Sequence, residues 1–157
     1  MAEKPQKSVY FKNRKAEFEY FLFDKIEAGI VLLGAEVKSI KIGGCDISKA
    51  HVMIHWREME MYVIDLHIKK LEHTAADGLY NPIRPRKLLV HKSEIRKMSE
   101  KTKQDGFTIV PTSLYVNRRN LVKVEIALAK GKKLHDKRDT IRARDLEREG
   151  RKSDEQF

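Results

Sequence analysis

Two alternating segments near the C-terminus, FTIVPTSLYVN (107–117) and LVKVEIALAK (121–130), constrain the fold more strongly than any other feature of the sequence. Successive side chains of a strand point to opposite faces, so alternation of apolar and polar residues predicts a strand with one buried face. In the second segment Lys123 and Glu125 lie opposite an apolar face made of Val122, Val124, Ile126 and Leu128. The intervening Arg118-Arg119-Asn120 predicts a hairpin connection. The chain therefore contains an antiparallel pair whose apolar face must be buried.

Segments upstream carry the same signals. Aromatic and β-branched residues between Glu17 and Gly34 predict strand, with a turn or bulge at Asp24-Lys25. Two more alternating segments between Asp46 and His67 flank Arg57-Glu58, which predicts a second hairpin. Short strands in sequential hairpins are therefore expected over much of the chain.

Helical spacing replaces alternation in two places. Residues 35–42 predict a short helix that stops at Gly43-Gly44, and residues 93–106 predict a helix with Ser93 as its N-cap. Between the hairpin and the second helix, residues 69–89 contain a glycine and two prolines, so we expect a long surface loop there.

About six short strands without βαβ spacing predict a mainly β fold, a closed antiparallel barrel that removes its own sheet edges. The oligonucleotide-binding (OB) type, with short inserted helices, is the closest small barrel that binds polyanions. A length of 157 residues suits a single domain. We expect a flexible N-terminus at 1–12, the barrel at 13–130 and a basic tail at 131–157.

The charge balance indicates the class of partner. Lysine and arginine number 33 against 23 acidic residues, a formal net charge of +10. Such a surplus attracts an anionic polymer or membrane. No apolar run approaches the roughly 20 residues that span a bilayer, and the N-terminus lacks the apolar core of a signal peptide. The lone Cys45 excludes an internal disulfide framework, which favours a reducing cytoplasm.

The tail after Gly131 has little apolar surface to bury. Leu134, Ile141 and Leu146 are its sizeable apolar residues, so we expect the tail to be disordered in the free protein. Its charge pairs at helical spacing contribute only ~0.2–0.5 kcal/mol each, so a partner must supply the remaining free energy that is needed to order the tail. Lysine and arginine neutralise phosphates, and the His135 ring can stack on a base. The alternative is a solubilising tail.

Enzyme chemistry is the minority hypothesis. His51 and His55 lie in a predicted strand without cysteine or acidic residues at ligand spacing, which favours structural side chains over a metal site. Cys45 has no evident catalytic context. The aspartates of the tail lie in a flexible segment that cannot preorganise a nuclease site. No catalytic residue, metal or cofactor is therefore predicted.

Five segments together resemble the small protein B family, the bacterial tmRNA-binding proteins of ribosome rescue. They are NRKAEFEYF (13–21), IEAGI (26–30), GAEVKSIK (34–41), RPRKLLVHKSEI (84–95) and LYVNRRNLVKVEIALAKGKKLHDKR (114–138). The resemblance spans about 13–145. It implies a barrel that binds the tRNA-like domain of tmRNA and delivers it to the A site of stalled ribosomes for trans-translation. A basic structural ribosomal protein that binds rRNA is the alternative, and the RNA that co-purifies with the protein separates the two.

The resemblance implies tmRNA contacts at Asn13, Glu27, Leu89 and Lys123. Lys123 can approach a phosphate, Leu89 can offer an apolar platform to a base, and Asn13 can bind base or sugar edges. The Glu27 carboxylate can accept from a base amino group, a 2′-hydroxyl or an arginine. Without the resemblance, a core position for Leu89 and a surface ion pair for Glu27 are the simpler readings.

The resemblance also implies that the tail acts at the decoding centre and settles only in an empty messenger channel. The matching residues are Gly131, Lys132, Lys133, His135, Asp136, Lys137 and Arg138. The match weakens after about Leu146, and Gly150 predicts that a tail helix stops there, since glycine costs roughly 1 kcal/mol in a helix. We expect a monomer with tmRNA and the ribosome as partners and no membrane.

Overall fold

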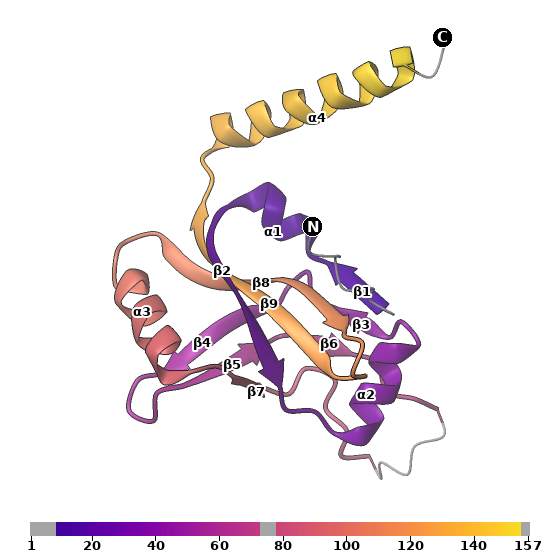
Figure 1. Ribbon diagram of the computed structural model, residues 1–157, viewed down its shortest axis with the longest axis vertical. Coiled ribbons are helices and arrows are strands. Elements are labelled where there is room, and N and C mark those ends of the chain that lie inside the picture. The colour runs from indigo at the N-terminus through magenta and orange to yellow at the C-terminus, as the bar shows by residue number, and fades with distance from the viewer. Residues whose placement is uncertain (1–8, 73–77, 155–157) are drawn as a thin grey trace.

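The computed structural model describes residues 9–72 and 78–154. The fold is mainly β with a few helices (Figure 1). The strands are β1 Val9–Lys12, β2 Tyr20–Ile30, β3 Cys45–Asp46, β4 His51–His55, β5 Glu60–Ile64, β6 His67–Ile68, β7 Arg86–Leu89, β8 Phe107–Val116 and β9 Val122–Gly131. The helices are α1 Arg14–Glu19, α2 Gly34–Lys41, α3 Lys92–Thr102 and α4 Leu134–Asp154.

Antiparallel pairing joins the strands into one large sheet. The order is β1-β8-β4-β5-β7-β2-β9, and β9 also pairs with β8. The short strands β3 and β6 form a separate pair. The apolar residues that the sheet encloses form one main core, which includes Met61, Val63, Leu88, Leu114 and Ile126, each no more than 2% exposed.

The C-terminal hairpin forms as predicted. β8 and β9 pair from Phe107↔Lys130 to Val116↔Val122, and alternate residues of β9 are buried up to Ile126. The turn is held by Asn117, whose Oδ1 accepts from the backbone N–H groups of Arg119 and Leu121. Asn120 has φ +65°, a left-handed conformation that asparagine tolerates better than most residues. The local pattern thus suffices for this hairpin.

The first long strand follows the prediction only in part. A register shift between Phe23 and Ile26 confirms the bulge at Asp24-Lys25, and Asp24 has φ +47°. Residues 14–19, however, form helix α1 rather than the beginning of the strand. The reason is local: the Oδ1 of Asn13 accepts from Ala16 N at 3.1 Å and caps the helix.

Two predicted irregular segments contain strands. Arg86–Leu89 lies in the predicted 69–89 loop yet forms β7, which pairs with both β5 and β2. Val9–Lys12, assigned to a flexible N-terminus, forms β1 and pairs with β8. Both strands are four residues long, so their alternation is too short to recognise, and their partners are distant in sequence. Residues 1–8 and 73–77 of these two predicted segments lie outside the described residues.

The two inserted helices lie where the sequence predicts them, but α3 ends at Thr102, before the predicted stop at Gly106, and its cap also differs. α3 begins at Lys92 and follows His91, whose backbone N–H donates to Glu94 Oε2 at 3.3 Å. The cap is therefore supplied by Glu94 rather than by Ser93.

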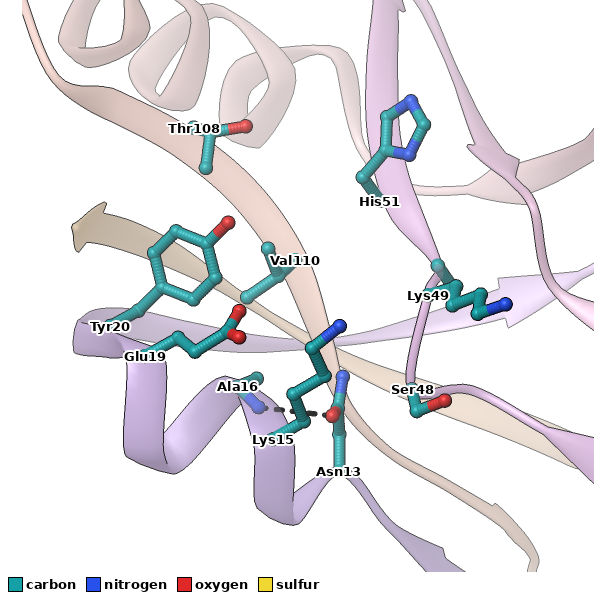
Figure 2. A pocket seen from close by; sticks show the side chains of 11 residues that line it. Asn13, Lys15, Ala16, Glu19, Tyr20, Ser48, Lys49, His51, Thr108 and Val110 are labelled. Atoms are coloured by element: carbon teal, nitrogen blue, oxygen red, sulfur yellow. Dashed lines mark hydrogen bonds between the residues drawn. The ribbon is translucent and has the colours of Figure 1, made fainter.

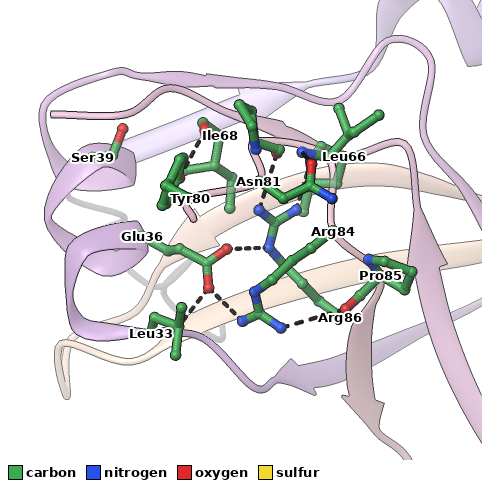
Figure 3. Close-up of polar contacts among 12 residues, drawn as sticks. Leu33, Glu36, Ser39, Leu66, Ile68, Tyr80, Asn81, Arg84, Pro85 and Arg86 are labelled. Atoms are coloured by element: carbon green, nitrogen blue, oxygen red, sulfur yellow. Dashed lines mark hydrogen bonds and ion pairs between the residues drawn. The ribbon is translucent and has the colours of Figure 1, made fainter. Parts of the chain in front are cut away.

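A buried ionic network fixes α2 against Leu66 and the 82–86 segment (Figure 3). The Glu36 carboxylate, fully buried, accepts from Arg84 Nη2 and from Arg86 Nε, both at 2.5 Å. Arg86 is also fully buried and donates to the carbonyl oxygens of Leu66 and Pro82. Burial acts to raise the pKa of Glu36, but hydrogen bonds from Arg84, the Leu33 N–H and Arg86 hold that pKa below its ordinary value.

The C-terminal tail forms helix α4, which extends away from the sheet beyond α1 (Figure 1). The structure therefore does not show the disordered tail that the sequence predicts, and the helix continues past Gly150 to Asp154. Ion pairs one turn apart, such as Arg151–Glu147 at 2.5 Å, support this helix. Its apolar residues remain open to solvent: Leu134 is 67%, Ile141 46% and Leu146 69% exposed.

Candidate nucleic-acid interface

Leu89, Gly29 and Lys123 form a row across three neighbouring strands. Gly29 of β2 is paired with Leu89 of β7 on one side and with Lys123 of β9 on the other. Directly paired residues present their side chains on the same face of a sheet. A Cβ atom at Gly29 would lie 3.1 Å from the Leu89 Cβ, so glycine leaves the space that Leu89 occupies. Leu89 is 58% exposed, which excludes the simpler reading as a core residue.

A shallow cavity of about 230 Å³ opens beside this row. It is lined by Gly29, Ile30, Leu32, Val37, Leu89 and residues 120–123. Its walls are thus mainly apolar, and Lys123 is the charged residue among them. An unstacked base needs an apolar or aromatic surface, and its phosphate needs a cation, so the row provides both.

Glu27 and two tyrosines extend the same face. Tyr115 is paired with Lys123, and Tyr10 with Tyr115, and the two tyrosine rings stack with centroids 6.5 Å apart. Glu27 is exposed, lies two residues before Gly29, and accepts a hydrogen bond from the Tyr115 hydroxyl. That bond orients a carboxylate toward which base amino groups or 2′-hydroxyls can donate. We call Glu27, Gly29, Leu89, Tyr115 and Lys123 the strand face.

The sequence did not single out the tyrosines of this region, although Tyr115 could have been found. The predicted hairpin register places Tyr115 directly beside Lys123. Tyr10 could not have been found in this way, because β1 was not predicted.

Asn13 does not belong to the strand face. Its side chain is 3% exposed, and Nδ2 donates to the carbonyl oxygens of Ile47 at 3.2 Å and Pro111 at 2.8 Å, while Oδ1 caps α1 (Figure 2). Both amide hydrogens and the amide oxygen are therefore engaged within the protein. In this structure Asn13 ties α1 to two other segments and offers no free group to RNA.

We expect Asn13→Ala to lower the free energy of unfolding by about 2–3 kcal/mol. The loss combines a helix cap with the two buried hydrogen bonds that Asn13 Nδ2 donates to Ile47 O and Pro111 O, although Ile47 O keeps the backbone N–H of Ala50 as a donor. Urea denaturation measures it. Asn81→Ala is the matched control, because Asn81 also accepts a backbone N–H, from Ile83, but in an exposed loop. An Asn13→Ala protein of unchanged stability that had lost RNA affinity would instead make Asn13 a direct contact.

The predicted tail residues divide into two groups, and the first builds the junction between β9 and α4. Gly131 still belongs to β9 and is paired with Tyr20. Lys132 donates from its backbone N to Glu19 O at 2.8 Å, and its Nζ donates to Glu17 O at 3.2 Å and to Thr140 Oγ1 at 3.0 Å. Its ammonium group also lies 5.3 Å from the centre of the Phe21 ring. Lys132 therefore anchors the tail to α1.

Asp136 completes the junction, and the residues of the second group are exposed or half-buried. The Asp136 Oδ2 accepts from Lys133 N at 3.1 Å, which caps the first turn of α4. His135 lies beside it, with Nε2 at 3.1 Å from Asp136 Oδ1, and its side chain is 72% exposed. Lys133 and Arg138 are exposed and Lys137 is half-buried. Of the predicted tail residues, these four have side chains that an RNA partner can reach.

An outer sheet face that combines an exposed apolar side chain, an ordered carboxylate and a lysine, on a chain of net charge +10, favours an RNA-binding protein. The family model described as SmpB protein matches residues 10–156. The chain belongs to the SmpB family.

Relatives of this family include two SsrA-binding proteins. The protein of Ehrlichia canis is 48% identical over 141 residues, which cover 90% of this chain and 93% of the relative. That of Chlorobaculum tepidum is 44% identical over 146 residues, covering 93% and 91%. A chain in a solved structure described as "tmRNA-SmpB: a journey to the center of the bacterial ribosome" superposes with a TM-score of 0.65 at 38% identity, covering 80% of this chain and 85% of that one.

Among the described residues, no helix is long and apolar enough to cross a membrane. The same residues contain no cluster of three or more histidine, cysteine, aspartate or glutamate side chains that could hold a metal ion. Burial raises the pKa of the Cys45 thiol to about 12, so this cysteine is protonated at neutral pH and weakly nucleophilic.

Proposed function

We propose that this protein binds the tRNA-like domain of tmRNA and delivers it to the A site of stalled ribosomes for trans-translation. The observation that carries the proposal is the row of Leu89, Gly29 and Lys123 on one sheet face, in a chain whose relatives are SsrA-binding proteins. Sequencing the RNA that co-purifies with the protein tests it. Recovery of ribosomal RNA in place of tmRNA would favour a structural ribosomal protein.

Within this function the strand face binds the tRNA-like RNA. Leu89 contacts an unstacked base, Lys123 a phosphate, and Glu27 accepts from a base amino group or a 2′-hydroxyl. Asn13 contributes indirectly by holding α1 in place. The protein acts as a cytoplasmic monomer, by binding alone, without a catalytic site or cofactor.

The sheet serves as a closed barrel of the OB type. This inference is supported by the succession of pairings, which runs from β8 through β4, β5, β7 and β2 to β9, and by the additional pairing of β9 with β8. The RNA-binding unit then ends at the last strand, and residues from 131 onward form the tail that reaches the ribosome.

The tail probes the decoding centre and the empty messenger channel. In the free protein the helical conformation of α4 is one member of a largely disordered ensemble, because its apolar side chains stay exposed and its ion pairs are worth little. Ordering costs on the order of 1–2 kcal/mol per residue, which phosphate contacts on the ribosome offset. A channel occupied by messenger RNA excludes the tail, so translating ribosomes are spared.

Salt dependence separates the two main contacts of the strand face. We expect Lys123→Ala to flatten the dependence of log K on log salt by about one unit, because one phosphate contact is lost. Leu89→Ala should weaken binding with the slope unchanged. Filter binding of the tRNA-like RNA at several salt concentrations measures both. Identical slopes for Lys123→Ala and the unmodified protein would remove Lys123 from the phosphate contacts.

A further inference from the structure

Glu27 and Lys123 carry opposite charges on the strand face and yet do not form an ion pair with each other. Lys123 is directly paired with Gly29, and Glu27 precedes Gly29 by two residues, so the two charged residues are diagonal neighbours on adjacent strands. Diagonal neighbours lie about 7–8 Å apart, which long side chains can bridge. Within the described part of the chain, neither side chain is joined to any other opposite charge. Two charges within reach of each other therefore remain apart.

The Tyr115 hydroxyl group explains this separation. It donates a hydrogen bond to Glu27 Oε2, although Tyr115 lies on β8 and Glu27 on β2, with β9 between them. Tyr115 is the direct partner of Lys123 on β9. Glu27 is the direct partner of Glu125, two residues further along the same strand. The hydrogen bond thus crosses β9 between Lys123 and Glu125, and it keeps the Glu27 carboxylate from turning toward the lysine.

Tyr115 is the fixed member of this hydrogen bond. It is 5% exposed, and its ring stacks on that of Tyr10 with centroids 6.5 Å apart. Packing of this kind locks a side chain and hence the position of its polar group. Glu27, by contrast, is exposed. The tyrosine therefore positions the carboxylate, and it acts on a bound RNA through its neighbours rather than by direct contact.

The second carboxylate near Lys123 is held by other groups. Glu125 Oε1 accepts from Thr112 Oγ1 at 2.7 Å and lies 3.8 Å from Lys25 Nζ. Its charge is thus met by a cation other than Lys123. With both neighbouring carboxylates held in place, the charge of Lys123 is left for a partner outside the protein, and an RNA phosphate is the group that it attracts.

We propose that Tyr115 is a positioning residue for RNA binding, whose hydroxyl group keeps Glu27 from pairing with Lys123 and so leaves the lysine free for a phosphate. The same hydrogen bond occupies Glu27 Oε2 and leaves Oε1 as the acceptor for an RNA donor. Without the hydroxyl group the carboxylate turns toward Lys123, because that lysine is an unpaired cation within its reach. The inference rests on the proposed function, since it takes the strand face as the site of the tRNA-like RNA.

Tyr115→Phe tests the inference, because it removes the hydroxyl group and keeps the buried ring. We expect the full-length variant to bind the tRNA-like RNA about fivefold more weakly, since an internal ion pair competes with the phosphate. The dependence of log K on log salt should flatten by up to about one unit, toward that of Lys123→Ala. This change of slope should vanish when Glu27→Gln is also present, because a neutral amide does not compete for the lysine. Filter binding at several salt concentrations measures these changes.

Tyr62→Phe is the matched control. The Tyr62 hydroxyl group also donates to a glutamate, Glu60 Oε2 at 2.8 Å, but that glutamate already forms an ion pair with Lys87 at 2.6 Å. Loss of this hydroxyl group therefore releases no carboxylate toward an unpaired lysine. The RNA affinity and the salt slope of Tyr62→Phe should equal those of the unmodified protein.

A measurement without RNA separates this inference from the proposed function. A crystal structure of Tyr115→Phe should show the Glu27 carboxylate within about 4 Å of Lys123 Nζ. A carboxylate that keeps its place would overturn the inference, as would an unchanged salt slope or a change of slope that persists with Glu27→Gln. If the unmodified protein does not bind the tRNA-like RNA, the proposed function itself is wrong.

Discussion

A chain cut after Lys133 keeps its affinity for the tRNA-like RNA and fails to support transfer of the nascent chain to tmRNA on stalled ribosomes. This is the result that we expect, because Leu89, Glu27 and Lys123 all precede the cut and lie on the sheet. The cut is placed after Lys133 rather than after Lys130 because Lys132 is bonded to α1. A gel shift and a tagging assay measure the two activities. Loss of nearly all RNA affinity on truncation would contradict this division of labour.

Point variants locate the effect within the tail. His135→Ala, and the pair Lys137→Ala with Arg138→Ala, should reduce tagging while sparing the tRNA-like RNA. The control removes two positive charges from the distal helix, Arg148→Ala with Arg151→Ala, beyond the part that resembles the family motif. If the proximal and the distal pair lost the same amount of tagging activity, the tail would act through its net charge alone.

Glu36→Ala should be the most destabilising single substitution that we consider. It leaves Arg86 fully buried without its carboxylate, and breaking a buried ion pair by removing one partner costs about 3–5 kcal/mol. The variant also frees α2 from Arg84 and Arg86. Urea denaturation measures the loss. Glu60→Ala is the control, because the Glu60–Lys87 pair at 2.6 Å is open to solvent, which screens it, so its removal should cost much less. Equal losses for the two variants would rule out an energetic role for burial.

The same network predicts a pH dependence. The pKa of Glu36 is lower in the folded protein than in the unfolded chain, so its contribution to stability is fully present above the unfolded pKa and is lost as the pH falls through the folded one. The difference between the unmodified protein and Glu36→Ala should therefore be constant above about pH 5 and shrink below about pH 4. If the stability difference between the two proteins grew as the pH fell, the pKa of Glu36 would have to be raised, not lowered, in the folded protein.

The elements whose signal is local could be predicted from the amino-acid sequence. The β8–β9 hairpin, the β4–β5 hairpin and the helices α2 and α3 each join residues that are close in sequence, and the turn residues Asp24-Lys25 mark the bulge in β2. The spacing of apolar residues, alternate in a strand and three or four apart in a helix, indicates which face of such an element is buried. The placement of Lys123 on the polar face of β9 follows from the same pattern.

Tertiary structure decided the features that join distant segments. β7 forms because β5 and β2 stand on either side of it, although its own four residues follow a proline. Gly29 leaves the space that Leu89 occupies, and the carbonyl oxygens of Ile47 and Pro111 accept the hydrogen bonds that hold the buried Asn13 side chain. Each of these partners is far in sequence from the residue it positions. Glu36 and Arg86 are fifty positions apart, and nothing local marks either as buried. Burial and pairing depend on which surfaces meet in space, and a local periodicity cannot encode that choice.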